Sequence, residues 1–198
     1  RIGAMGPVAI VPQGVAVNTT DDRVLILDYE RGLKVSEHPS GGPIVGAPLA
    51  LGDDIVWVTE SGQVISSTGW AVTASDSAVG GLSGDGSRVY FGTLTGEVVA
   101  VDKVGVQWRT VMPGPAVGRP AIRDGTLYAA YTGLEGQPGG VVALNAYDGE
   151  FRWRTPLDRD PATGPSVSHA LLIPDRTGEM VGIDPISGDR LWIAPVEG

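Results

Sequence analysis

Two histidines are the only imidazole groups in this chain of 198 residues, so acid–base or nucleophilic catalysis would have to be sought around them. A Ser–His–Asp arrangement needs an imidazole beside an activated hydroxyl. His38 lies in the sequence SEHPSGG between two repeats, and His169 lies in SVSHALL at the start of a strand. Neither is near a GxSxG nucleophile elbow. We therefore interpret both as ordinary turn or surface residues and predict no catalytic residue.

Three acidic groups could supply carboxylates for a metal or for glycoside hydrolysis. They are TTDDR (19–23), GDD (52–54) and DRD (158–160). None matches the spacing of a calcium-binding loop. A glycosidase needs two carboxylates held roughly 5–10 Å apart in a walled site, and the segments around these groups are short. We interpret them as solvated turns and predict no metal site.

The composition narrows the class of protein. The chain has no cysteine, which excludes disulfides, thiolate metal sites and cysteine nucleophiles. Its formal net charge of −9 repels phosphate backbones, so we predict no nucleic-acid partner. No apolar run is long enough to span a membrane. With 30 Gly and 15 Pro beside 42% hydrophobic residues, the sequence favours an all-β fold with many tight turns.

A pattern of strand, Asp or Asn, short turn, Gly and Trp returns in five copies along the chain, of which the first has no Trp and the second has Ser in place of the acid. Its five glycines are separated by 36 to 44 residues, a period typical of repeat architectures. The residues of the pattern are Asp28, Gly32, Gly69, Trp70, Asp102, Gly105, Trp108, Asn145, Gly149, Trp153, Asp184, Gly188 and Trp192. We predict that they have a structural role, with Asp or Asn and Gly forming the turn and Trp packing between neighbouring repeats.

Each repeat reads as four short antiparallel strands, and such units of about 40 residues form β-propeller blades. The sequence therefore predicts one domain over 1–198 with five blades. Their approximate ranges are 4–40, 41–77, 78–114, 115–160 and 161–198, and the second strands are predicted at 14–17, 55–58, 88–91, 126–130 and 170–173. We expect a closed five-bladed ring, and the alternative is that these blades form part of a larger propeller.

The repeats resemble a known family. GGVVALNAYDGEFRW and GEMVGIDPISGDRLW are similar to the tryptophan-docking repeat of quinoprotein-like propellers, the PQQ-like repeat. GEVVAVDKVGVQW resembles a shortened copy, and DRVLILDYERGLKV resembles one without its Trp. The quinone dehydrogenases of this family have larger propellers, a cysteine pair and a bound calcium, and the chain has no cysteine. We therefore expect no cofactor.

The resemblance is better to the non-catalytic branch of that family, which includes outer-membrane assembly scaffolds and extracytoplasmic domains of receptor kinases. It implies a non-enzymatic interaction module with a protein partner, located outside the cytoplasm in the periplasm, at the cell surface or secreted. We weighed a carbohydrate-binding propeller as the alternative, with Trp70 as the stacking residue, while Trp57 is expected in the core. A glycoside hydrolase or a quinone-dependent dehydrogenase fits the sequence less well.

The segment YTGLEGQPGG (131–140) lengthens the fourth repeat between its second and third strands. In a propeller these loops share one face with the connections between blades, and loops carry much of the function of a rigid scaffold. We predict a partner-binding face there, with a solvated surface as the alternative. Its candidate residues are Asp21, Asp22, Glu60, Tyr131, Glu135, Asp158, Arg159, Asp160, Asp175 and Arg176.

Overall fold

The computed structural model describes residues 6–195, which form twenty β-strands in five antiparallel sheets of four. We call the sheets blades 1 to 5. Blade 1 has β1 (Ala9–Val11), β2 (Gly14–Asn18), β3 (Arg23–Leu27) and β4 (Lys34–Pro39). Blade 2 has β5 (Leu49–Leu51), β6 (Asp54–Val58), β7 (Gln63–Ser66) and β8 (Ala71–Thr73). Blade 3 has β9 (Val79–Gly84), β10 (Val89–Gly92), β11 (Glu97–Asp102) and β12 (Gly105–Val111). Blade 4 has β13 (Ala116–Arg123), β14 (Thr126–Tyr131), β15 (Gly140–Asn145) and β16 (Phe151–Pro156). Blade 5 has β17 (Ser166–Val167), β18 (Leu171–Pro174), β19 (Glu179–Ile183) and β20 (Arg190–Pro195).

Each blade is a meander in which consecutive strands pair, so the strand order in the sheet follows the chain. The all-β prediction and the four-stranded unit are therefore confirmed. The second strands agree with their predicted positions to within about a residue at each end, because runs of β-branched and aromatic residues bounded by Gly and Asp favour short strands. No helix occurs among the described residues, and within that range nothing is long and apolar enough to cross the membrane as a helix.

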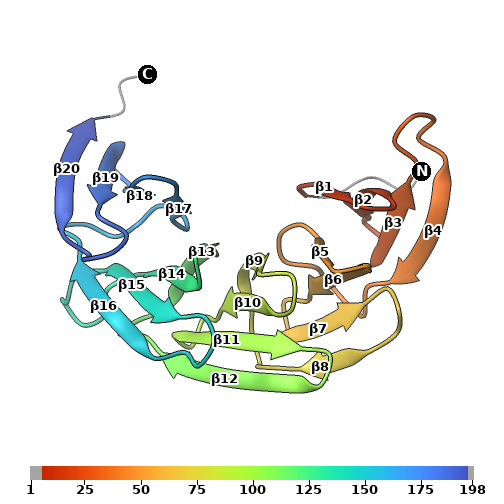
Figure 1. The fold of residues 1–198 in the computed structure, drawn as a ribbon, viewed down its shortest axis with the longest axis horizontal. Coiled ribbons are helices and arrows are strands. Elements are labelled where there is room, and N and C mark those ends of the chain that lie inside the picture. Colours follow the sequence, from red (N-terminus) through yellow and green to blue (C-terminus); the bar gives the residue numbers. More distant parts are fainter. Residues whose placement is uncertain (1–5, 196–198) are drawn as a thin grey trace.

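The blades stand side by side in an arc, with β1, β5, β9, β13 and β17 toward its concave side (Figure 1). Four clusters of buried apolar residues hold the arc together, one at each boundary between neighbouring blades. The first, for example, packs Val24 and Ile26 of blade 1 against Trp57 of blade 2. The core of this protein therefore lies between its sheets.

The concave side is crowded, which explains the small residues that open each repeat. A side-chain carbon on Gly80 would come within 2.0 Å of the backbone of Gly118, and one on Gly118 within 2.1 Å of Gly164. Both Gly80 and Gly118 also have positive φ, at 73° and 64°. Only glycine allows the inner strands of blades 3, 4 and 5 to approach this closely.

The five blades do not close on themselves. Blade 1 and blade 5 stand at the two ends of the arc, with an open gap between them (Figure 1). Our expectation of a closed five-bladed ring is therefore wrong, because the rotation from one blade to the next is too small for five blades to complete a circle. The alternative, a section of a larger propeller, is consistent with the arc.

Candidate functional site

A docked tryptophan joins blade 3 to blade 4, and another joins blade 4 to blade 5. The indole Nε1 of Trp108 in β12 donates a hydrogen bond of 3.1 Å to the carbonyl of Ala146 in the next blade. Its ring packs on Gly149, where a side-chain carbon would come within 2.6 Å of the indole. At the following boundary, Trp153 donates to the Pro185 carbonyl at 3.2 Å and packs on Gly188 in the same way.

Small and aromatic residues of the tryptophan's own blade also shape this docking site. Across the outer hairpin, each tryptophan faces a small residue of its own blade, Ala100 opposite Trp108 and Ala143 opposite Trp153. A tyrosine hydroxyl from the second strand lies 3.1 Å from each accepting carbonyl oxygen. Tyr128 donates to the Pro185 carbonyl, whereas the single hydroxyl proton of Tyr90 goes to the closer Oδ2 of Asp85, at 2.6 Å. Each docked indole therefore lies beside a tyrosine at a largely buried boundary.

Blade 2 has a tryptophan at the equivalent position, but its indole points to an acceptor in its own blade. Trp70 follows a tight turn and lies opposite the small residue Ser66, whose amide donates to the Trp70 carbonyl at 3.0 Å. Its indole Nε1 donates to Oδ2 of Asp54 in its own blade, at 2.7 Å. The turn of blade 3 that should receive it is left open, because a side-chain carbon on Gly105 would have no atom within 4 Å.

Asp54 holds the indole through a carboxylate that accepts several hydrogen bonds. Oδ1 accepts from the Ile55 amide at 2.9 Å and the Ser67 hydroxyl at 2.7 Å, and Oδ2 also accepts from the Thr68 hydroxyl at 2.7 Å. Partial burial acts to raise the pKa of Asp54. The hydrogen bonds from Ser67, Thr68 and Trp70 outweigh it, and the pKa lies below its ordinary value. The carboxylate is therefore charged and fixed at neutral pH.

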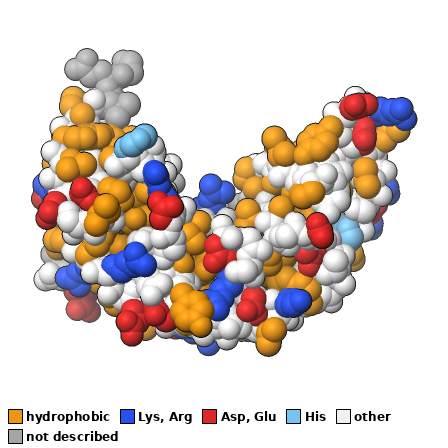
Figure 2. Space-filling model, in the orientation of Figure 1, with side chains coloured by type: hydrophobic (Ala, Val, Ile, Leu, Met, Phe, Trp, Pro, Cys, Tyr) orange, Lys and Arg blue, Asp and Glu red, His pale blue; other side chains and the backbone are white. Residues whose placement is uncertain are grey.

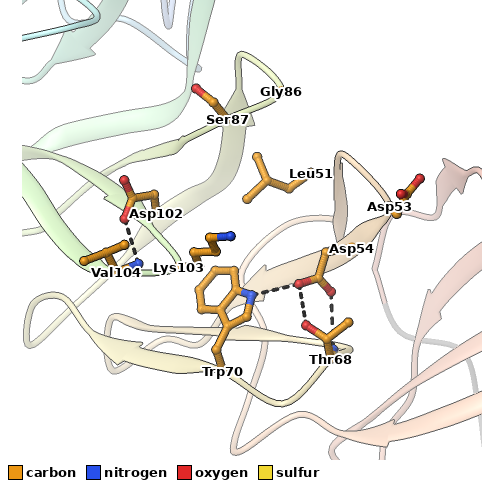
Figure 3. Close-up of a pocket in the computed structure, with 10 residues that line it drawn as sticks. All are labelled: Leu51, Asp53, Asp54, Thr68, Trp70, Gly86, Ser87, Asp102, Lys103 and Val104. Atoms are coloured by element: carbon orange, nitrogen blue, oxygen red, sulfur yellow. Dashed lines mark hydrogen bonds between the residues drawn. The ribbon is translucent and has the colours of Figure 1, made fainter.

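A pocket of about 530 Å³ remains between Trp70 and blade 3, and we call it the Trp70 pocket (Figure 3). Leu51 and Trp70 line it from blade 2, and the segment Asp102 to Val104 lines it from blade 3. Its rim carries Asp53 and Lys103. Sequence reasoning singled out Trp70 and Asp102 but missed the pocket. The pocket could have been suspected from the acidic residue at the start of β6, because the equivalent position of blade 4 is a threonine.

The last docking tryptophan, Trp192 in β20, has no blade beyond it in the described arc. It lies opposite Gly182, where a side-chain carbon would come within 2.3 Å of its ring, so it follows the same plan as the others. The side chain nevertheless remains 43% exposed, beside the exposed Leu191 and Ile193. Within the described residues, the outer flank of blade 5 is therefore only partly covered.

The predicted partner-binding face divides into two parts. In an antiparallel meander, the loops between second and third strands lie at the same end as the connections between blades. Three of the predicted residues, Arg159, Asp160 and Asp175, lie there at the boundary of blades 4 and 5. Arg159 pairs with Asp175 at 3.4 Å and with Glu179 at 2.5 Å. Asp160 accepts from the Gly133 amide at 2.9 Å, which fixes the long loop of blade 4.

Asp158 is also paired, since Arg190 donates a hydrogen bond to it at 2.7 Å. This hydrogen bond is the largest cause of the lowered pKa of Asp158. Arg176 and Glu135 lie in the exposed loops of blades 5 and 4. The remaining acids are on other blades along the arc, Asp21 and Asp22 in the β2–β3 loop and Glu60 in the β6–β7 loop. Over the side of the molecule shown in Figure 2, charged side chains of both signs are interspersed with hydrophobic ones.

Two predicted members of the face are buried. Tyr131 is the last residue of β14, is only 2% exposed, and packs in the cluster between blades 3 and 4. Its place on the partner-binding face is therefore a wrong prediction. Asp175 is 7% exposed and accepts from the amides of Thr177 and Glu179, at 2.8 and 2.9 Å. It organises the β18–β19 turn instead of offering a free carboxylate.

The structure places the two histidines on different blades, at opposite ends of the arc. His38 lies in β4, not in a loop as expected, with Nε2 3.1 Å from the Ser36 hydroxyl and its ring 6.2 Å from that of Trp57. His169 lies in the β17–β18 turn beside Ser168. Trp57 is buried, as expected. Among residues 6–195, no group of three or more His, Cys, Asp or Glu side chains is placed so that it could hold a metal ion.

Comparisons with known proteins agree on one family. Residues 60–198 match the family model described as "Outer membrane protein assembly factor BamB". The assembly factor BamB of Yersinia pestis is 30% identical over 122 residues, which are 57% of this chain and 30% of that protein. BamB of Burkholderia pseudomallei is 25% identical over 170 residues, 79% of this chain and 43% of that protein. The chain thus spans less than half the length of these relatives.

The fold agrees with the same comparison. The crystal structure of BamB from Moraxella catarrhalis superimposes with a TM-score of 0.72 at 20% sequence identity, covering 96% of this chain and 61% of that one. This likeness supports the β-propeller architecture. Because the family model matches more than half of the chain, the protein belongs to the BamB family of PQQ-like repeat β-propellers.

Proposed function

We propose that this protein is a non-enzymatic scaffold that binds protein partners outside the cytoplasm, in the assembly of outer-membrane proteins. Its membership of the BamB family supports this proposal, because the relatives that it matches are named as outer-membrane protein assembly factors. The expectation from the sequence, an extracytoplasmic interaction module, is the same. The comparisons give no support to a glycan partner, and the proposal does not include one.

We propose that the partner binds the loop end of blades 4 and 5, which we call the blade 4–5 platform (residues 132–139, 158–160 and 175–178). The observation that carries this proposal is a long loop held rigidly beside charged side chains. The Gly133 amide is bound by Asp160, the Gln137 amide by the Leu134 carbonyl at 2.9 Å, and the Leu157 amide by the Gly139 carbonyl at 2.9 Å.

The chemistry of the platform suits a protein surface. Leu134 is 51% exposed at the tip of the fixed loop and can anchor an apolar contact, while the exposed Arg176 can pair with an acidic group of the partner. A loop that is already ordered loses little conformational entropy on binding. An apolar centre with a polar rim is the usual anatomy of a protein interface.

The test is capture of partners from the cell envelope of the source organism, followed by mass spectrometry. We expect the unmodified protein to retain components of outer-membrane protein assembly, and Leu134→Asp to retain at least fivefold less of them. Ile186→Asp is the matched control, because Ile186 is an apolar residue, 89% exposed, in a turn at the opposite end of blade 5.

Two results would count against the proposal. Equal capture by Leu134→Asp and by the control would exclude the blade 4–5 platform as the binding face. A captured set without any assembly component would argue against the function itself. Circular dichroism of both variants checks that they remain folded.

A further inference from the structure

We infer that the Trp70 pocket binds an aromatic side chain with a hydrogen-bond donor, a tryptophan or tyrosine presented by a partner protein. This site lies at the turn end of the strands, opposite to the blade 4–5 platform, and the inference goes beyond the proposed function. It rests on how the chain itself fills the two equivalent boundaries.

At those two boundaries, the carbonyl one residue after the turn Asp or Asn accepts an indole N–H beside a tyrosine hydroxyl. The Ala146 carbonyl oxygen accepts from Trp108 at 3.1 Å, and the nearby Tyr90 hydroxyl gives its proton to Oδ2 of Asp85 at 2.6 Å. The Pro185 carbonyl oxygen accepts from Trp153 at 3.2 Å and Tyr128 at 3.1 Å. A carbonyl that accepts an indole N–H next to a second aromatic ring is therefore the repeated recognition element of this molecule.

At the boundary of blades 2 and 3, neither aromatic group reaches the corresponding carbonyl. That carbonyl belongs to Lys103, in a turn one residue shorter than the other two, and within residues 6–195 no hydrogen bond to it is found. The indole of Trp70 is held by Asp54 instead. The position of the tyrosine, opposite Ser66 on the second strand, is occupied by Val56, which has no hydroxyl. The turn is thus a docking site that the chain leaves unfilled.

The space and the walls of the pocket suit an aromatic ring. About 530 Å³ is available, and pockets of this size hold small organic groups. The Trp70 ring and the side chains of Leu51 and Val104 provide apolar walls, and Figure 3 shows the indole directed between Asp54 and the blade 3 turn. Aromatic pairs gain from offset or edge-to-face contact beyond the area that they bury.

A cationic ligand fits less well. The lining includes the carboxylates of Asp53 and Asp102 and the amine of Lys103, and Oδ1 of Asp102 already accepts from the Val104 amide at 2.8 Å and from Gln107 at 3.0 Å. The Asp54 carboxylate is already engaged by the hydrogen bonds of its own blade. Both carboxylate oxygens of Asp54, which an arginine would need as acceptors, are therefore already hydrogen-bonded.

The experiment is a titration of the ¹⁵N-labelled protein with N-acetyl-tryptophanamide, followed by NMR. We expect a dissociation constant of roughly 1 mM, a value typical of a lone side chain. The largest shifts should fall on the Trp70 indole N–H and on the amides of Val104 and Gly105. N-acetyl-tyrosinamide should give the same map, and N-acetyl-leucinamide and N-acetyl-argininamide should bind at least fivefold more weakly.

The matched variants are Val104→Asp and Ile186→Asp. Both residues lie two positions after the Asp of an equivalent turn and are 83% and 89% exposed, so both variants are expected to fold. Val104→Asp should weaken binding of the tryptophan probe at least fivefold, and Ile186→Asp should leave it unchanged. The inference is overturned if the probe does not bind, if its shifts fall elsewhere, if the arginine probe binds more tightly, or if both variants behave alike.

Discussion

The boundary between blades 4 and 5 and the boundary between blades 2 and 3 are built from the same plan with different results. In both, a tryptophan in the outer hairpin lies opposite a small residue, Ala143 for Trp153 and Ser66 for Trp70. Trp153 reaches the next blade, whereas Trp70 is held by Asp54 of its own blade. The same side chain therefore joins two blades or lines a pocket, depending on which acceptor is nearer.

The largest difference should appear when each tryptophan is removed. Trp153→Ala should lower the free energy of unfolding by about 3–5 kcal/mol, because it empties a packed boundary and removes a hydrogen-bond donor. Trp70→Ala should cost about half as much, since one side of its ring already faces the pocket. Urea unfolding measures both, and equal losses would contradict the comparison.

Glycine substitutions separate the docking contact from turn strain. Gly188→Ala should cost at least about 2 kcal/mol, because its positive φ is unfavourable for alanine and the new methyl group would meet the Trp153 ring. Gly32→Ala has the same kind of φ but open space, and should cost about 1 kcal/mol. Thermal denaturation compares the two. If Gly32→Ala were as costly as Gly188→Ala, the ring contact would add nothing.

The role of Asp54 can be tested by pH. The pKa of this carboxyl is depressed in the folded state, so the unfolded state binds more protons in the acidic range. Its contribution is therefore present above the ordinary pKa of 3.8 and is lost as the pH falls through the lower folded value. We expect Asp54→Asn to lose up to about 1 kcal/mol at pH 7 and to show a shallower loss of stability in acid. If the stability of the two proteins fell equally with pH in acid, this role of Asp54 would be excluded.

The smallest effect is expected on the blade 4–5 platform. Glu135→Ala should change the free energy of unfolding by less than about 0.5 kcal/mol, because the residue is exposed at a loop tip. Measured beside Trp153→Ala, it shows whether stability resides between blades or in the loops. A loss comparable to that of Trp153→Ala would show that our assignment of strands in blade 4 is wrong.

Much of the fold could be predicted from the sequence because turn chemistry is local. An Asp or Asn, a Gly and a Trp mark the outer hairpins of blades 3, 4 and 5, and two of the three mark those of blades 1 and 2. These residues predicted the number of sheets and the strands within them. The openness of the arc could not be predicted in this way. The repeat period predicts the number of blades, but the rotation between them depends on close backbone contacts between inner strands, such as that of Gly80 with Gly118.

The candidate sites were harder to predict because they depend on contacts between repeats. The short turn before Trp70 hid its alignment with Trp108 and Trp153, which appears only in the strand pairing. The sequence places Tyr131 at the start of a loop, whereas in the structure it is the last residue of β14, which is buried along its whole length. In GDD, Asp54 was interpreted as solvated, because its indole partner lies 16 residues further along the chain.

The exposed flank of Trp192 has a consequence for how the molecule opens. Blades 2, 3 and 4 share apolar clusters with a neighbour on each side, whereas blades 1 and 5 share one cluster each. In such a linear array, stability is close to a sum of nearest-neighbour contacts, so fraying starts from the ends. Amide protons of β20 should therefore exchange with solvent long before those of β11, which are released only when the whole array comes apart.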